Sequence, residues 1–181
     1  MEASVEYFEN PGKENTARVL ELVAEKARAR DVKKVVLAST TGKTAVKARD
    51  AFQNEDFELV VVPHQYGFRG KPSAFPEDLA ESLEEDGVTV HWGTMLFHTR
   101  ELYKSGSPGA LAQILRCFCQ GMKVCFEITY MAADGGCVAA GEQFIAVGGT
   151  RSGADTAVYA TASTSQAPGD LNIHEILCMP R

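Results

Sequence analysis

The sequence predicts a three-layer α/β sandwich with a mostly parallel sheet and an antiparallel C-terminal edge. Helical and strand patterns alternate along the first half of the chain, which is typical of such folds. The strand candidates at residues 33–39 and 57–62 contain near-continuous apolar runs, as expected for strands buried on both faces of a parallel sheet. The link between the strand candidates at residues 143–147 and 156–162 is too short for a helical crossover, so this pair should be antiparallel.

Composition fits one globular domain. The 181 residues are 45% hydrophobic and 23% charged, and 18 Lys and Arg against 24 Asp and Glu give a net charge of -6. The absence of a basic block excludes a nucleic-acid or anionic-membrane footprint. No apolar run has the length of a signal-peptide core or a membrane span. We therefore expect a cytoplasmic protein whose single domain covers residues 1–181, with no nucleic acid or membrane among its partners.

The remaining elements follow from periodicity and turn signals. Helical spacing at residues 16–30, capped by Asn15 or Thr16, predicts the first helix, and a second runs through about Phe52. Pro76 and Gly87 delimit a third helix, before a short strand at residues 88–92. Apolar residues spaced by three or four predict one long helix at about 107–134, with a bend at Gly121. A last strand is expected at residues 171–177.

Cysteine and histidine patterns do not predict a metal site. The five cysteines are an odd number without a CxxC pair, and the four histidines form no HExxH-type cluster. Cys117, Cys119 and Cys125 fall in the apolar stretch, where reduced cysteine packs as a small hydrophobe. Lys123 and Glu127 are four residues apart on the same helix and are expected to pair, with a pocket acid as the alternative role of Glu127.

The predicted topology brings five segments to one edge of the sheet. Strand C-termini and the N-termini of the following helices lie at the same edge in such folds. The segments concerned are residues 11–16, 39–44, 64–71, 93–96 and 148–155.

One of these segments has the chemistry of a phosphate-binding turn. It lies between a buried strand and a helix and consists of Ser39, Thr40, Thr41, Gly42, Lys43 and Thr44. Hydroxyls, a close backbone approach at glycine and the unpaired N–H groups of a helix start all suit a phosphate. A P-loop is excluded, because Leu37 stands where that motif needs its first glycine. The same residues can equally serve only as helix caps.

A second glycine-containing segment follows the strand at residues 143–147. Its residues are Gly148, Gly149, Thr150, Arg151, Ser152, Gly153, Ala154, Asp155 and Thr156. Successive N–H groups can form an anion-binding nest, and an arginine fork matches a phosphate. A plain hairpin connection is the alternative.

A third group of residues is a candidate wall for a planar ring. It comprises His64, Gln65, Tyr66, Gly67 and Phe68, with Trp92, Gly93 and Thr94 beside them. Exposed loop aromatics that only pack over the edge are the alternative interpretation.

From about Asn15 onward the chain resembles the C-terminal α/β domain of pyruvate kinase, in the small stand-alone form found in prokaryotes. The resemblance is carried by residues 33–45 (KKVVLASTTGKTA), 144–150 (FIAVGGT) and 153–157 (GADTA). Residues 11–16 (PGKENT) and 121–125 (GMKVC) are similar to signatures of the stand-alone group.

The resemblance implies that the two glycine loops lie on neighbouring strands around a phosphate. In pyruvate kinase this domain is regulatory and holds a sugar-bisphosphate effector, and the corresponding positions here are residues 40–44 and 149–153. Stand-alone relatives resemble flavin mononucleotide (FMN) binders, which implies FMN as cofactor. The catalytic barrel of pyruvate kinase is not among these 181 residues, so we do not expect that activity. The segment at about 93–133 goes beyond the usual regulatory domain.

The functional expectation is therefore a protein that binds a phosphate-bearing small molecule, FMN favoured, at the C-terminal edge of the sheet. One alternative is an enzyme that acts on a phosphosugar or uses flavin for redox chemistry, with His64, Lys43 or Glu127 transferring protons. Another is a regulatory or assembly module whose long helix forms an interface, including one between identical subunits.

Overall fold

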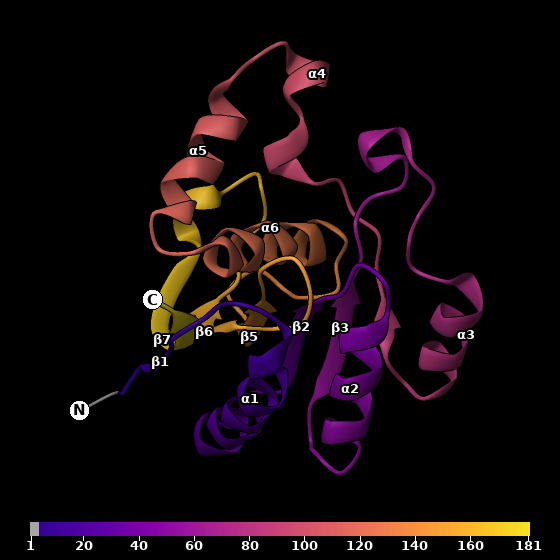
Figure 1. The fold of residues 1–181 in the computed structure, drawn as a ribbon, viewed down its shortest axis with the longest axis vertical. Helices are drawn as coiled ribbons and strands as arrows, with labels where there is room; N and C mark the ends of the chain where they lie inside the picture. Colours follow the sequence, from indigo (N-terminus) through magenta and orange to yellow (C-terminus); the bar gives the residue numbers. More distant parts are fainter. Residues whose placement is uncertain (1–3) are drawn as a thin grey trace.

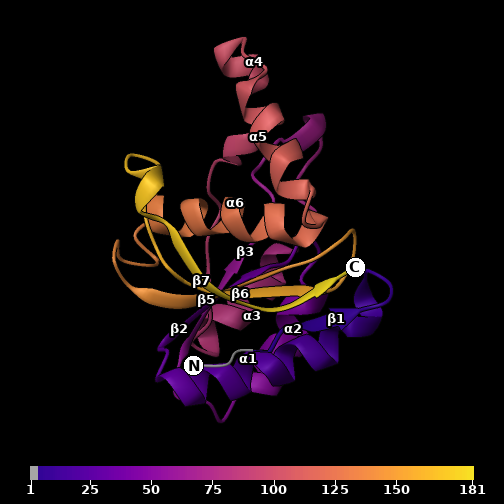
Figure 2. The same cartoon turned by 90° about the vertical axis from the view of Figure 1, so that its left-hand side faces the viewer.

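The structure, a computed structural model that describes residues 4–181, is a three-layer α/β fold around one seven-stranded sheet (Figure 1). Helices α1 (Thr16–Arg30), α2 (Lys43–Phe52) and α3 (Glu77–Glu85) pack on one face of the sheet. Helix α6 (Gln120–Asp134) packs on the other face, and Figure 2 shows α6 and α1 on opposite sides of the strands. The predicted fold class is confirmed.

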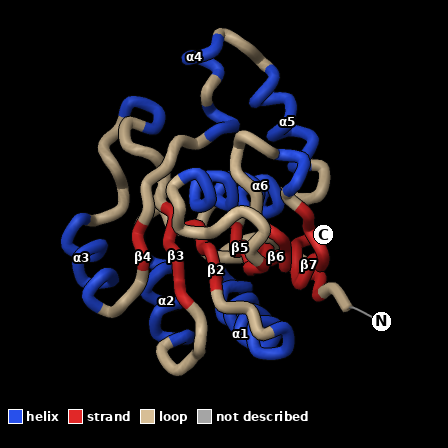
Figure 3. Tube along the Cα trace, turned by 180° about the vertical axis from the view of Figure 1, so that it is seen from behind, coloured by secondary structure: helices blue, strands red, loops and turns tan. Residues whose placement is uncertain are grey.

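The sheet has the order β1-β7-β6-β5-β2-β3-β4, and its strands form the central layer in Figure 3. The strands are β1 (Glu6–Phe8), β2 (Lys34–Ala38), β3 (Glu58–Val62), β4 (Thr89–Val90), β5 (Gln143–Gly148), β6 (Thr156–Thr161) and β7 (Asn172–Pro180). Only β6 runs antiparallel to its neighbours, β5 and β7, while the other pairs are parallel. The short link after β5 therefore reverses the chain, as predicted, and β2 and β5 are adjacent.

Alternating side chains of the central strands enter two separate cores, as the two-residue period of a strand requires. Val35 and Leu37 of β2 lie in the core under α1, α2 and α3. Val36, between them, lies in the core under α6. All three side chains are fully buried, which explains why the strand reads as a continuous apolar run.

The region predicted as one helix at about 107–134 consists of two helices, α5 (Ser107–Arg116) and α6. The backbone at Cys119 is extended (φ −171°, ψ 169°), and its Sγ accepts a hydrogen bond from Met122 N at 3.3 Å. Cys119 therefore caps α6, and the chain breaks before Gly121 instead of bending at it. Gly121 has another role, because a Cβ there would lie 2.0 Å from Thr156 Oγ1 on β6.

The α4 (Arg100–Tyr103) and α5 region projects away from the body of the molecule (Figures 1 and 2). Five large apolar side chains here are between 55% and 70% exposed: Leu102, Tyr103, Leu111, Ile114 and Phe118. Cys125 is buried as predicted, whereas the prediction that Cys117 packs in the interior is wrong, because Cys117 follows the projecting helix α5 and is exposed. Within residues 4–181, no helix has the length and apolar character needed to cross a membrane.

Candidate functional site

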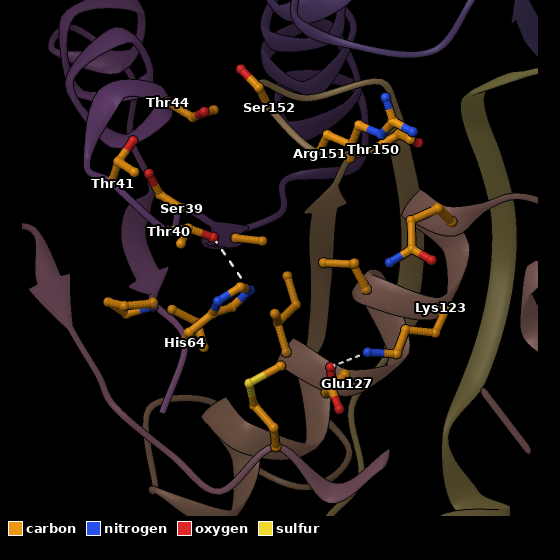
Figure 4. Close-up of a pocket in the computed structure, with 18 of the residues that line it drawn as sticks. Ser39, Thr40, Thr41, Thr44, His64, Lys123, Glu127, Thr150, Arg151 and Ser152 are labelled. Atoms are coloured by element: carbon orange, nitrogen blue, oxygen red, sulfur yellow. Dashed lines mark hydrogen bonds and ion pairs between the residues drawn. The ribbon is translucent and has the colours of Figure 1, made fainter. Parts of the chain in front are cut away.

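A cavity of about 730 Å³ lies at the C-terminal ends of β2, β3 and β5, between these strand ends and α6 (Figure 4). Its volume is within the range of about 300–1,000 Å³ that is usual for small-molecule sites. The cavity also lies where the sheet reverses direction between β5 and β6, next to the parallel pair of β2 and β5. This is the kind of position at which open α/β sheets bind ligands.

The loop between β2 and α2 contributes hydroxyl groups and a cation to the cavity. Ser39 Oγ accepts a hydrogen bond from Ala45 N at 3.2 Å, which fixes the loop against the first turn of α2. Gly42 has a left-handed backbone (φ 80°), and Leu79 of α3 covers it from outside: a Cβ at Gly42 would lie 2.1 Å from Leu79 Cδ2. The exposed Lys43 begins α2, whose first N–H groups lack acceptors within the helix.

The loop after β5 is held by residues that lie outside the cavity. Asp155 is fully buried, and its Oδ2 accepts hydrogen bonds from Thr150 N and Gly12 N, both at 3.0 Å. Thr16, one of the two predicted caps of the first helix, instead accepts a hydrogen bond from Ala154 N at 3.0 Å. The N-terminal segment therefore fixes the shape of this loop.

Arg151 stands out in this loop because its backbone is left-handed (φ 64°) although it is not glycine. A non-glycine residue in this region costs about 1–2 kcal/mol, and such strain concentrates at functional sites. Arg151 and Lys43 line the same cavity, as the predicted convergence of the two loops requires.

The cavity lining is strongly cationic although the protein carries a net charge of -6. Five lining residues are basic: Lys43, Arg69, Arg116, Lys123 and Arg151. Glu127 is the only acidic residue that lines the cavity in the described part of the chain. Local groups, and not the overall field of the protein, therefore favour an anion here.

Helix α6 forms the wall across the cavity from Thr41 and Thr44 and carries a buried ion pair (Figure 4). Lys123 Nζ donates to Glu127 Oε2, and the side chains are only 2% and 4% exposed. Glu127 Oε1 also accepts a hydrogen bond from Phe97 N at 3.1 Å, which ties the turn at residues 96–98 to α6. Burial lowers the pKa of Lys123 and Glu127 opposes this shift. The pairing expected from the four-residue spacing is confirmed, and both residues also face the cavity.

Two histidines border the cavity and flank the ring of Phe68. The ring centroid of Phe68 lies 4.8 Å from that of His64 and 5.0 Å from that of His98. Burial lowers the pKa of both histidines, against the raising effect of Glu127, so both are expected to be neutral at pH 7. His98 Nδ1 is buried without a hydrogen-bond partner among the described residues, although it lies 3.4 Å from Glu127 Oε1.

The structure brings twelve of the predicted site residues to the cavity. They are Ser39, Thr40, Thr41, Lys43, Thr44, His64, Phe68, Gly149, Thr150, Arg151, Ser152 and Gly153. The other predicted residues lie behind the lining or beside it: Gly42, Gly67, Gly93, Thr94, Gly148, Ala154, Asp155 and Thr156.

The predicted aromatic wall is divided between two places. Phe68 lines the cavity, whereas Tyr66 and Trp92 pack on each other with ring centroids 5.5 Å apart. Trp92 also contacts Phe75 on the α1–α3 side of the sheet, at 5.9 Å between centroids. Trp92 therefore belongs to the core there and does not line the cavity.

The α5–α6 wall, apart from Glu127 with its alternative role as a pocket acid, is the part of the lining that the sequence did not predict. It consists of Arg116, Gln120, Lys123, Val124, Glu127, Ile128 and Met131. From Gln120 onward these positions follow the helical spacing of α6, so the signal is one polar-to-apolar stripe on that helix, whereas Arg116 is on α5 before the break at Cys119. Further unpredicted lining residues are Ala38, Val62, Pro63, Arg69, Met95 and His98. Groups of three or more potential metal ligands do not occur among residues 4–181.

Comparison with solved structures finds pyruvate kinase. A Cryptosporidium parvum pyruvate kinase in complex with ADP matches 81% of the present chain, with 14% sequence identity and a TM-score of 0.41. A second Cryptosporidium parvum pyruvate kinase structure is similar over 80%, with 16% identity and a TM-score of 0.39. The chain spans about a quarter of the length of these pyruvate kinase chains, 23% in each case.

The similarity is to pyruvate kinase, the family that the sequence resemblance named, and to only part of its chain. No protein-family model matches this sequence.

Proposed function

We propose that the protein binds a phosphate-bearing small molecule in the cavity at the C-terminal edge of the sheet. The observation that carries the proposal is the convergence of the two loops, which bring Lys43 and Arg151 to the lining of one cavity in an acidic protein. Glu127, the one carboxylate on the lining among the described residues, is already paired with Lys123. The positive charge at the two loops therefore favours an anionic ligand.

The two loops supply the groups that suit the phosphate. Thr40, Thr41 and Thr44 place hydroxyls on the lining, beside the first turn of α2. Lys43 and Arg151 add cations from the two sides, and arginine can bind two phosphate oxygens at once. A helix start adds N–H donors and the positive end of the helix dipole.

The rest of the lining fits the planar ring of FMN, which is the first ligand to test. Phe68, Met95, Ile128 and Met131 give this part of the cavity an apolar surface, and His64 adds a neutral polar edge. An apolar surface with a few polar groups is typical of cofactor sites. Bound FMN would supply redox chemistry, while the residues of this chain hold its phosphate and exclude water from its ring.

Binding of FMN compared with riboflavin tests the proposal, because riboflavin lacks the phosphate. We expect FMN to bind the purified protein at least about tenfold more tightly, as a charge-assisted contact contributes about 1.5–3 kcal/mol. The variant Lys43→Ala should lose most of this preference in isothermal titration. Lys47→Ala is the matched control, because Lys47 is on the same helix but outside the cavity.

Equal affinity for FMN and riboflavin would reject FMN as the phosphate ligand. Fructose 1,6-bisphosphate and inorganic phosphate are the next probes. If neither of these nor FMN raises the melting temperature at saturating concentration, the phosphate site itself is wrong.

Self-association is a second candidate role, favoured by the exposed apolar side chains of α4 and α5. Five large apolar residues on one projecting segment exceed the scattered exposure normal for a monomer. Light scattering on the purified chain and on Ile114→Lys tests this role. A monomer at high protein concentration would exclude it.

A further inference from the structure

The α5–α6 wall carries a second group of charged side chains that the phosphate loops leave unused. Arg116, Gln120, Lys123 and Glu127 all line the cavity and follow one another at spacings of three or four residues. In Figure 4 Lys123 and Glu127 lie across the cavity from Thr41 and Thr44. These residues belong to α5 and α6, and none of them is in the two loops on which the phosphate proposal depends.

The charges of this wall do not cancel. Glu127 neutralises Lys123, since the two form a buried ion pair. Arg116 Nε donates to the neutral side chain of Gln120, with 2.6 Å between Nε and Oε1. Within the described residues Arg116 forms no ion pair, so its charge remains uncompensated.

The wall is spatially separate from the hydroxyl groups that suit a phosphate. In Figure 4 the Lys123–Glu127 pair lies across the cavity from Thr41 and Thr44, with His64 between them. An anionic group bound at Lys123 therefore leaves room for a phosphate at Thr41 and Thr44. The volume of about 730 Å³ accommodates both.

We propose that Arg116 and Lys123 form a second subsite that binds the carboxylate of a small organic acid. A monoanion matches the single uncompensated charge of this wall, and its two oxygens match the planar fork of arginine. The dianionic phosphate matches the loops better than this wall, because the loops offer more hydroxyl and N–H donors. The second subsite does not depend on a phosphate being bound, so it goes beyond the function proposed above.

Gln120 and Glu127 are positioning residues in this subsite. Gln120 holds the arginine through its Nε, which leaves the terminal nitrogens of the guanidinium for the carboxylate. Glu127 orients Lys123, whose ammonium group has further protons to donate. Burial already lowers the pKa of Lys123, and a bound carboxylate would raise it again.

Methyl NMR of methionine-labelled protein can detect the two subsites separately from each other. Met95 and Met131 line the cavity, whereas Met179 on β7 is buried away from it and serves as the internal reference. We expect sodium acetate to shift the methyl signals of Met95 and Met131 in a saturable way. Acetamide has the same shape without the charge and should leave them unchanged.

Two variants separate the subsite from the phosphate site. Arg116→Gln should weaken acetate binding about tenfold or more, as loss of a charge-assisted contact predicts, and leave the response to inorganic phosphate intact. Lys43→Ala should do the reverse. Both residues are at least partly exposed, so both variants are expected to fold.

Three results would overturn the second subsite. They are an equal response to acetate and acetamide, acetate binding that survives Arg116→Gln, and full competition between acetate and inorganic phosphate. In the last case the phosphate proposal would still hold, whereas loss of the phosphate response alone would reject only that proposal.

Discussion

The two faces of the sheet are built on the same strands but bury different chemistry. Under α1, α2 and α3 lies a continuous apolar cluster with aliphatic and aromatic side chains. Under α6 an apolar cluster is joined by a buried lysine, a buried glutamate and a buried threonine: Lys123, Glu127 and Thr129. The apolar face thus stabilises the fold, whereas on the α6 face the desolvation of buried charged groups beside the cavity lowers the free energy of unfolding.

The largest expected effect tests whether the ion pair under α6 is costly to break. Glu127→Gln keeps an acceptor for Phe97 N but leaves the buried ammonium of Lys123 unpaired. We expect a loss of about 3–5 kcal/mol in the free energy of unfolding, measured by urea denaturation. The double variant Lys123→Met, Glu127→Gln should recover most of this loss, because it removes both charges.

The matched control is a surface pair on the other face. Arg49 of α2 and Asp86 after α3 lie 3.1 Å apart, with side chains 28% and 50% exposed. Asp86→Ala should cost less than about 1 kcal/mol. Equal losses for the buried and the surface pair would contradict the contrast between the two faces.

A smaller effect is expected at the contact between α6 and the sheet. A Cβ at Gly121 would lie 2.0 Å from Thr156 Oγ1 and 2.8 Å from Asp155 Oδ1. Gly121→Ala should therefore destabilise the protein by about 1–3 kcal/mol, as overpacking does, and displace the residues that hold the loop after β5.

Gly109 of α5 gives the comparison in open space. Among residues 4–181, no heavy atom beyond its chain neighbours and the backbone of its own helix would lie within 4 Å of a Cβ there. Gly109→Ala should stabilise the protein by up to about 1 kcal/mol through helix propensity. Thermal melts of the two variants check the difference, and a neutral Gly121→Ala would show that α6 can move away from the sheet.

The smallest effect concerns pH and the two cavity histidines. Burial lowers the pKa of His64 and of His98 below the ordinary value of 6.5. Between the folded and unfolded pKa values the unfolded chain binds more protons, so stability is complete above pH 6.5 and falls on acidification below it. We expect the melting temperature to decrease between about pH 7 and pH 5.5, above the range in which carboxylates with ordinary pKa values titrate.

The double variant His64→Gln, His98→Gln should flatten this pH dependence. His174 on β7 is the control, because its side chain is exposed and lies outside the cavity. A slope that is unchanged in the double variant would show that other groups cause it.

Strands β2, β3 and β5 and the antiparallel turn to β6 could be predicted because continuous apolar runs and a short connecting segment are visible in the local sequence. Strand β1 could not, since its three residues are partly exposed and are ordered by pairing with β7, far along the chain. The break between α5 and α6 was missed for a related reason. Its cap is a cysteine sulfur, which is not a usual helix-start signal.

The site divides in the same way between local and tertiary information. The loop residues were predictable because hydroxyls, glycines and cations cluster within a few positions. Glu127 was a candidate pocket acid, but the rest of the α5–α6 wall was not predictable, because Arg116 and Lys123 have the pattern of an amphipathic helix until the packing brings them to the cavity. Trp92 was misplaced because sequence gives no means of telling a core aromatic from a cavity aromatic.

The hydrogen bonds from Gly12 and Ala154 have a practical consequence for anyone who transplants or redesigns the loop after β5. Its conformation depends partly on Gly12 and Thr16, whose hydrogen-bond partners lie 143 and 138 positions later in the chain. A grafted copy of residues 148–155 alone would lose two of its anchors. Affinity tags or deletions near the start of α1 should therefore be judged by ligand binding as well as by folding.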